Sequence, residues 1–242
     1  DWSLFAATGE PAEIWILHLA NRSGRTRELD LFSYFEWNLG FAPDNHREFH
    51  KTFIETAFDP EEQILFAGKR LWEMPDDQGR HWNVVWPWTA FFAASVPVAG
   101  YEGDKESFIG RLGDLAAPHA VQAGSCRNSQ GKWGDGIASL QLQLTLQPDE
   151  EQEIVFVLGA ADSSAQAYEL TQKYRSPGAA RDELERVRKG WQERLAPFQV
   201  ETPDPAFDLL LNTWLKYQAI SCRLWARAAY YQQSGAYGFR DQ

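Results

Sequence analysis

Cysteine is scarce in this chain, whose 242 residues contain only Cys126 and Cys222. Two such distant cysteines form neither the dense disulfide framework of small secreted domains nor the paired spacing of a zinc knuckle. A reducing compartment is the simplest interpretation, and we expect a cytoplasmic protein.

The sequence also lacks any uncharged apolar run near the ~20 residues that span a bilayer. Its first residues have no basic start, apolar stretch or small-residue cleavage site, as a signal peptide would. We therefore expect no membrane association. The first residue is Asp1 and not methionine, so we expect the sequence to be part of a longer chain.

Positive charge is in deficit, with 23 Lys and Arg against 34 Asp and Glu and a formal net charge of −11. A field of this sign repels phosphate backbones, so we expect no nucleic-acid partner. Aromatic residues are plentiful, at 14% of the chain with eleven tryptophans. Tryptophan fits either a thick β-sheet core or a face on which sugars stack, and the core is the commoner use.

Residues 13–159 have the periodicity of β-strands. Residues 13–19 and 27–37 flank a turn at Asn21, which predicts an antiparallel hairpin. Residues 52–58 and 63–66 form a second predicted pair, and residues 88–95 read as a strand covered on both faces. Strict alternation over residues 139–146, followed by a turn into residues 153–158, predicts the clearest pair. The Asn21 tripeptide matches a glycosylation acceptor, but we interpret it as a turn only.

After Gly159 the pattern becomes helical. Ser163 or Ser164 is expected to cap a helix over residues 165–174, and a second helix runs from about Pro177 to Leu195. A third begins near Pro203 and Pro205, with apolar residues at three- and four-residue steps.

The last residues break this helical pattern with a polar, glycine-rich segment that contains Tyr237, Phe239, Arg240 and Asp241. A guanidinium and a carboxylate side by side can grip the hydroxyls of a pyranose, and an aromatic ring can stack on its face. The alternative is an ion pair at a helix end, with glycine as the C-cap.

Three other constellations carry weaker signals. His46 and His50 are four residues apart, but their context favours a loop over a metal site, and we expect no metal. The glycines at residues 131–136 fit no phosphate-binding spacing, and we expect a turn or a loop that reaches a neighbouring subunit. Residues 80–83 with Trp86, Pro87 and Trp88 could line a sugar groove, although packing between sheets is the commoner role.

Residues 231–242 resemble the entry to the catalytic barrel of the glycoside hydrolase family 94 disaccharide phosphorylases. Residues 100–110, 124–129 and 155–159 resemble successive landmarks of that family's N-terminal sandwich, in the same order. The resemblance implies an antiparallel β super-sandwich, then a helical linker and the first helix of an (α/α)6 barrel. It places the later part of the sandwich at residues 1–162, the linker at 163–202 and the start of the barrel at 203–242.

The resemblance also implies an inverting phosphorylase that reversibly cleaves a β-glucosidic disaccharide or oligosaccharide with inorganic phosphate as co-substrate and no cofactor. Arg240 and Asp241 would bind the sugar, with Tyr237 and Phe239 as stacking candidates. The general acid is expected beyond Gln242, and a homodimer is the family's usual state. Two alternatives remain: a noncatalytic carbohydrate-binding or assembly module, and the phosphorylase-like region of a cyclic β-1,2-glucan synthase.

Overall fold

A computed structural model describes residues 1–40, 51–70, 86–132 and 134–221. Backbone contacts divide the chain into two compact units, Asp1–Leu184 and Glu185–Gln242. The predicted domain boundaries at 162/163 and 202/203 stay a prediction.

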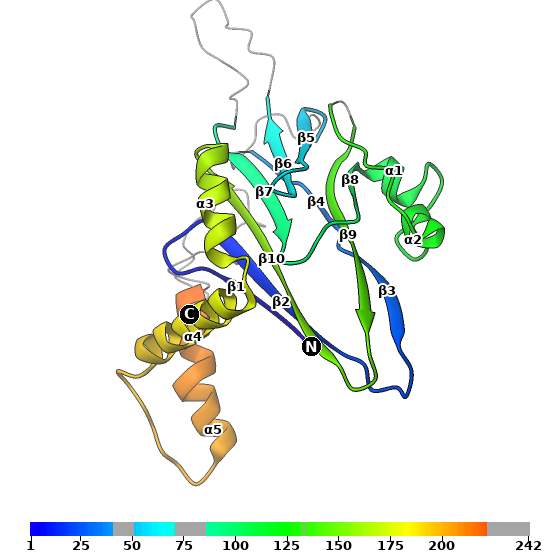
Figure 1. The fold of residues 1–242 in the computed structure, drawn as a ribbon. Helices are drawn as coiled ribbons and strands as arrows, with labels where there is room; N and C mark the ends of the chain where they lie inside the picture. The colour runs from blue at the N-terminus through cyan, green and yellow to red at the C-terminus, as the bar shows by residue number, and fades with distance from the viewer. Residues whose placement is uncertain (41–50, 71–85, 133, 222–242) are drawn as a thin grey trace, which may run out of the picture. The chain divides into compact units, whose positions relative to one another are not determined.

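The first unit is built on two antiparallel β-sheets, shown in Figure 1. The six-stranded sheet has the order β1 (Trp2–Ala6), β2 (Ala12–Ala20), β10 (Glu151–Ala161), β7 (Thr89–Ala94), β6 (Ile64–Lys69) and β5 (Ile54–Asp59). In the four-stranded sheet, β9 (Gly136–Leu146) pairs with β3 (Arg27–Phe32), β4 (Phe35–Glu36) and β8 (Gly100–Asp104). These sheets confirm the predicted antiparallel sandwich.

An aromatic core fills the space between the two sheets. The rings of Phe92 and Phe156 stack with centroids 5.5 Å apart, and Trp15 packs against both. Leu140 and Leu142 of β9 reach the same core from the opposite sheet. Alternation along each strand makes this packing possible, since every second side chain points to the same face.

A second core lies on the outer face of the six-stranded sheet. Val155 and Val157 point outward from β10 and pack with Ala167 and Leu170 of helix α3 (Ser164–Tyr174). Because β10 and β7 are covered on both faces, their sequences are almost continuously apolar. The prediction of a doubly covered strand at residues 88–95 is therefore confirmed.

Two of the three predicted strand pairs are wrong, the first and the last along the chain. Strand β2 pairs with β1 and β10, whereas β3 pairs with β9, so residues 13–19 and 27–37 lie in different sheets. Strands β9 and β10 likewise belong to opposite sheets. The predicted pair of residues 52–58 and 63–66 is confirmed, because β5 and β6 are antiparallel neighbours.

Asn21 joins the two turns at which the chain crosses between the sheets, the β2–β3 turn and the β9–β10 turn. Its backbone exchanges hydrogen bonds with the other turn, N to Glu150 O at 2.9 Å and O from Asp149 N at 2.9 Å. Its side-chain amide donates to the carbonyls of Arg25, Leu146 and Gln147. Asn21 is 5% exposed, so it serves as a structural tie between the two crossovers.

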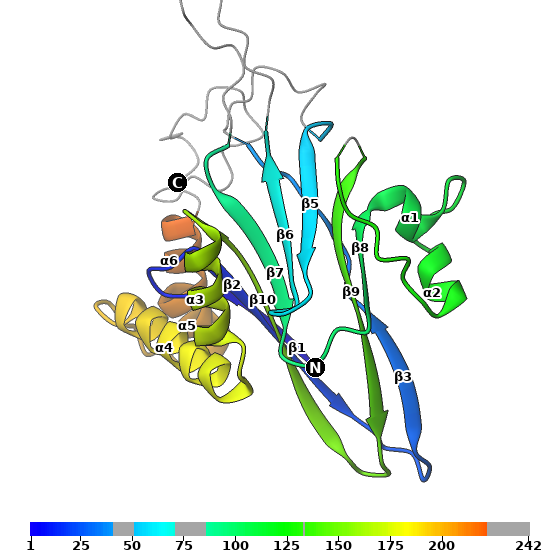
Figure 2. The same cartoon turned by 45° about the horizontal axis from the view of Figure 1, so that its top comes forward.

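Two short helices flank the four-stranded sheet, as Figure 2 shows: α1 (Lys105–Ile109) and α2 (His119–Ala123). Asp104 caps α1 by accepting a hydrogen bond from Ser107 N at 2.9 Å. In the same unit, Ser163 caps α3 and is one of the two serines that the sequence offered for this role.

Helix α4 (Pro177–Leu195) begins in the first unit and continues into the second, within the range predicted from the sequence. The second unit continues with α5 (Pro205–Leu209), a π-helical turn η2 (Leu210–Trp214) and α6 (Leu215–Ala219). Asp204 caps α5, and Pro205 occupies its first turn. The rings of Trp191 and Tyr217 lie 5.3 Å apart, which joins the end of α4 to α6.

Candidate functional site

The residues that the sequence singled out for sugar binding lie outside the described part of the chain. These are Tyr237, Phe239, Arg240 and Asp241, and their role stays a prediction. His46 and His50 also lie outside it, as do residues 80–83. The geometry of the described residues therefore concerns the sandwich itself.

The landmark at residues 100–110 is the β8–α1 connection, and its central group is a buried carboxylate. Glu102 is fully buried and accepts hydrogen bonds from Arg127 N, from Ser129 N at 3.1 Å and from the Ser129 hydroxyl. A carboxylate that accepts several backbone N–H groups fixes the loop that supplies them. Two separate sequence landmarks, 100–110 and 124–129, thus form one structural element.

Cys126 lies within that loop and is a poor nucleophile. Burial and the nearby Glu102 charge raise the pKa of its thiol to about 12. The reactive form of cysteine is the thiolate, which is scarce at neutral pH under these conditions.

A second polar cluster joins strand β4 to helix α1. The Glu36 carboxylate accepts hydrogen bonds from Lys105 Nζ at 2.7 Å, from Lys51 Nζ and from the Tyr34 hydroxyl at 3.1 Å. Lys105 and Lys51 lower the pKa of Glu36 to about 2. Burial and Glu36 raise the pKa of Tyr34. Asp135 lies 3.6 Å from Lys51 and 3.7 Å from Lys105, so both ammonium groups are held by two carboxylates.

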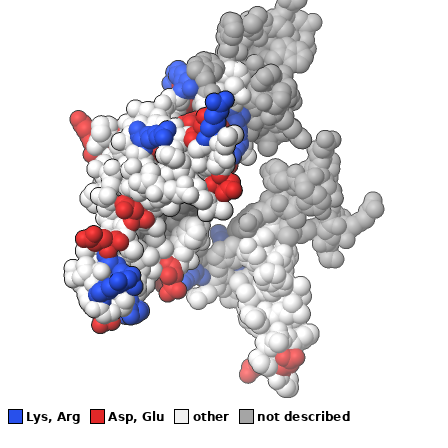
Figure 3. Space-filling model, turned by 90° about the vertical axis from the view of Figure 1, so that its right-hand side faces the viewer, with Lys and Arg blue, Asp and Glu red and all other residues white. Residues whose placement is uncertain are grey.

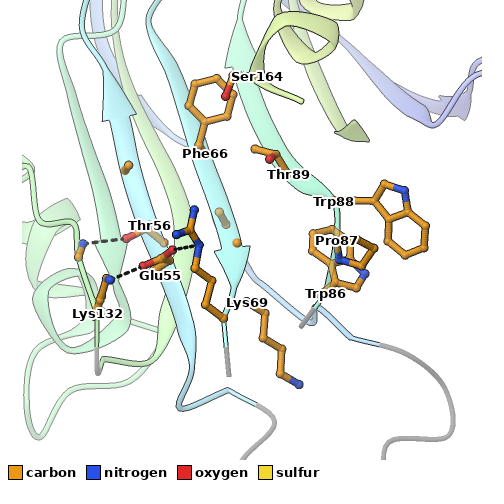
Figure 4. Close-up of a pocket in the computed structure, with 15 residues that line it drawn as sticks. Glu55, Thr56, Phe66, Lys69, Trp86, Pro87, Trp88, Thr89, Lys132 and Ser164 are labelled. Carbon is orange, nitrogen blue, oxygen red and sulfur yellow. Dashed lines mark hydrogen bonds and ion pairs between the residues drawn. The ribbon is translucent and has the colours of Figure 1, made fainter. Parts of the chain in front are cut away.

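An open groove of about 940 Å³ lies on the outer face of the six-stranded sheet. Strands β5, β6 and β7 form its floor, as Figure 4 shows. The outward-facing floor residues are small or apolar: Ala57, Phe66, Gly68 and Thr89. The ring of Phe66 also contacts Tyr168 of α3, so the groove begins where α3 stops covering the sheet.

Tryptophans form one side of this groove. Trp86, Pro87 and Trp88 lie directly before β7 and are among the lining residues. In Figure 4 the Trp88 ring points away from Phe66 and Glu55. The Trp86 and Trp88 rings are 5.7 Å apart at an interplanar angle of 69°. Trp88 is 39% exposed.

Charged groups form the opposite side. Glu55 makes ion pairs with Arg70 at 3.0 Å and with Lys132 at 2.9 Å. Lys132 follows Gly131, which is anchored by reciprocal backbone hydrogen bonds of 2.9 Å with Thr56. In Figure 4, the Lys69 side chain extends away from these two ion pairs of Glu55.

The charges on the face drawn in Figure 3 form small mixed groups of both signs. Within the described residues, no three or more His, Cys, Asp or Glu side chains are placed to hold a metal ion. No helix in the described ranges is both long and apolar enough to cross a membrane.

Comparison with known proteins follows the division of the chain. The sequence profile of the glycosyl hydrolase 94 supersandwich domain matches residues 1–177. The profile of the glycosyl hydrolase 94 superfamily catalytic domain matches residues 190–242. The chain belongs to glycoside hydrolase family 94.

Several relatives match nearly the whole chain. The cyclic β-(1,2)-glucan synthase NdvB of Rhizobium meliloti is 37% identical over 96% of this chain and 8% of its own length. The solabiose phosphorylase of Paenibacillus borealis is 32% identical over 99% of this chain and 29% of its own. The N,N'-diacetylchitobiose phosphorylase of Vibrio proteolyticus is 28% identical, again over 99% and 29%. The chain thus spans less than a third of each of these relatives.

Sequence reasoning found part of the groove and missed the rest. For Trp86, Pro87 and Trp88 the sequence favoured packing between sheets over a sugar groove. All three line a groove, and Trp86 also packs against the core between the sheets. Glu55 was missed, because an isolated glutamate in a strand carries no signal by itself. Lys132 stands in a motif that the sequence assigned to a turn or a subunit-contacting loop, and only the pairing of Thr56 with Gly131 brings it to Glu55.

Proposed function

We propose that this chain is part of an inverting glycoside phosphorylase, which reversibly transfers a sugar from a β-glucosidic disaccharide or oligosaccharide to inorganic phosphate. One observation carries this proposal: supersandwich and catalytic-domain profiles of family 94 match consecutive parts of a single chain. The catalytic match favours an enzyme over a noncatalytic binding module. Two of the relatives named above are phosphorylases, which agrees with this choice.

The chemistry needs one protein acid. Phosphate is already an anionic nucleophile and takes the place of the activated water of an inverting hydrolase. The departing sugar oxygen needs a proton, which a positioned carboxylic acid supplies. We place that acid beyond Gln242, so this chain alone is inactive. Arg240 and Asp241 bind the sugar, with Tyr237 and Phe239 as stacking groups.

The sandwich has a supporting role in this proposal. It would shape the mouth of the active site within a homodimer in the cytoplasm. The buried anchors described above, Glu102 and the Glu36 cluster, would keep its loops in place.

A second candidate is the phosphorylase-like region of a cyclic β-1,2-glucan synthase. The match to NdvB favours it, because the identity of 37% extends over 96% of this chain. Both candidates share the family 94 chain organisation. They differ in substrate, which is a β-glucosidic disaccharide or oligosaccharide for the first and a β-1,2-glucan for the second.

The test uses the intact protein that contains this chain. It is incubated with inorganic phosphate and, separately, cellobiose, N,N'-diacetylchitobiose and a linear β-1,2-glucan, and ³¹P NMR follows the products. Inversion at a β-linkage must yield an α-sugar 1-phosphate. Its formation from a disaccharide supports the first candidate, and formation from the β-1,2-glucan alone supports the second. Release of free sugar without phosphate, or of a β-sugar 1-phosphate, would overturn both.

A further inference from the structure

We propose that the hollow beside helices α1 and α2 binds a sugar phosphate through the guanidinium groups of Arg111 and Arg127. The hollow has a volume of about 380 Å³, and α1, α2 and the loop after α2 supply its lining. Figures 1 and 2 show the two helices next to each other beside β8. The sugar part of the ligand rests on the proposed function, whereas the binding of a phosphate group does not.

Arg111 and Arg127 are unusual because their side chains have no partner in the described part of the chain. The other Lys and Arg side chains in these ranges, except Arg25, each take part in a polar, ionic or ring interaction. The chain has 34 Asp and Glu against 23 Lys and Arg. A shortage of carboxylates therefore does not explain two unpaired guanidinium groups that line one hollow.

The backbone that carries both arginines is fixed. Arg127 donates its backbone N–H to the buried carboxylate of Glu102. Arg111 follows Gly110, whose φ of 95° is rarely adopted by residues with a side chain. A Cβ at Gly110 would also lie 3.4 Å from the Cβ of His119, so glycine lets His119 and Arg111 reach the same hollow. A site that is already formed loses little conformational freedom when a ligand binds.

The lining supplies the donors that a phosphate group needs. Each guanidinium presents planar, forked N–H groups that match two phosphate oxygens. The Ser107 hydroxyl and the His119 imidazole line the hollow as well, and both can donate a hydrogen bond. Ser107 uses its backbone N–H to bond Asp104 at 2.9 Å, which leaves its hydroxyl available to a ligand.

Two carboxylates in the lining decide which phosphate compound fits best. Asp104 is engaged as the cap of α1. Glu106 is exposed and forms no ion pair with the described residues. A bare phosphate ion would gain from the arginines but would be repelled by Glu106. A sugar phosphate can place a hydroxyl group against Glu106, which accepts its hydrogen bond, so the lining favours a sugar phosphate over inorganic phosphate.

Modification of arginine by phenylglyoxal, followed by peptide mass spectrometry, tests the site on the intact protein that contains this chain. α-Glucose 1-phosphate should slow the modification of Arg111 and Arg127. Arg25 is the matched internal control, because it is also unpaired but lies outside the hollow, and its modification rate should not change. Glucose, and potassium chloride at matched ionic strength, should protect neither arginine of the hollow. Inorganic phosphate should protect both, but less well than the sugar phosphate.

R111Q tests whether the two arginines act on one ligand. It should raise by about tenfold the concentration of α-glucose 1-phosphate that halves the modification rate of Arg127. R25Q is the matched control variant and should leave this concentration unchanged. All three arginines are exposed, so neither substitution removes a buried contact.

The proposal would be overturned by a lack of protection at matched ionic strength or by equal effects of R111Q and R25Q. It would also be overturned if Arg111 and Arg127 were unreactive without ligand, because another part of the protein would then cover the hollow. Equal protection by inorganic phosphate would overturn the choice of a sugar phosphate. Phosphorolysis of a disaccharide is scored separately by ³¹P NMR, so a hollow that binds no sugar phosphate leaves the proposed function standing.

Discussion

At the scale of single residues, the clearest electrostatic feature of the sandwich is Glu36. Lys105 and Lys51 hold the pKa of its carboxyl at about 2, against its usual 4.5. A depressed folded-state pKa stabilises the protein fully above the unfolded-state pKa, and this contribution is lost as the pH falls toward the folded-state value. Glu36 should therefore make the sandwich acid-sensitive between about pH 4.5 and about pH 2.

We predict that Glu36→Gln lowers the free energy of unfolding at neutral pH by on the order of 2 kcal/mol. The difference from wild type should shrink as the pH falls below about 4.5, because wild-type Glu36 then becomes protonated. Urea denaturation at a series of pH values measures this.

Glu28→Gln is the control for this prediction. Glu28 is an exposed strand glutamate, and it forms no ion pair with the described residues. A Glu36→Gln deficit that stays constant from neutral pH down to about pH 3 would contradict the assigned role of Glu36.

At the scale of elements, the sequence predicted strands well and their partners less well. Alternation and turn residues locate β2, β5, β6, β7, β9 and β10 because they depend on neighbours in the sequence. Pairing depends on long-range contacts. A turn at Asn21 is equally compatible with a hairpin and with a crossover to the other sheet, so local signals could not decide between them.

The two long helices α3 and α4 were predicted well because their signals are local, whereas the short helices α1 and α2 lie in the range assigned to strands and were missed. Serine at the N-cap of α3, proline in the first turn of α4 and Pro205 at the start of α5 all act on the adjacent backbone. The groove is the opposite case. Trp88 and Lys132 both line it but are more than 40 residues apart in the sequence. Only the folded sheet brings them to one groove.

The hydrogen bonds of Asn21 between the two crossovers give a prediction at the scale of elements. Asn21→Asp replaces an amide that donates to three carbonyls with a carboxylate that cannot donate. The carboxylate would keep the hydrogen bonds from Ser23 N and Ser23 Oγ, but it would face the three carbonyl oxygens with no donor. We expect a loss of about 3–5 kcal/mol in the free energy of unfolding, the cost of breaking a buried polar network. Chemical denaturation followed by tryptophan fluorescence measures the loss.

Asn128→Asp is the matched control for the crossover tie. Asn128 also lies in a loop, but its side chain acts as an acceptor for Tyr101 N at 2.9 Å, a role that a carboxylate can keep. If Asn21→Asp were no more destabilising than Asn128→Asp, the two crossovers would not depend on the Asn21 amide.

At the scale of the whole molecule, the family match and the terminal motif concern the same segment of the chain. The catalytic-domain profile covers residues 190–242, which include the segment that sequence reasoning singled out for sugar binding. The acid that protonates the leaving group is expected outside this segment. The contribution of the segment should therefore appear in the affinity for sugar and not in the affinity for phosphate.

We predict that Arg240→Lys and Asp241→Asn, made in the intact protein, each lower kcat/KM for the disaccharide by about tenfold to a hundredfold, while KM for phosphate stays unchanged. Lysine keeps the charge of arginine but loses its planar, forked donors, and asparagine loses a charge-assisted acceptor. Arg181→Lys and Asp182→Asn are the matched controls, because they alter another adjacent Arg-Asp pair on the exposed surface of α4. Steady-state kinetics with each substrate varied in turn makes the comparison. A rise in KM for phosphate with unchanged sugar kinetics would instead assign the Arg240–Asp241 pair to the phosphate site.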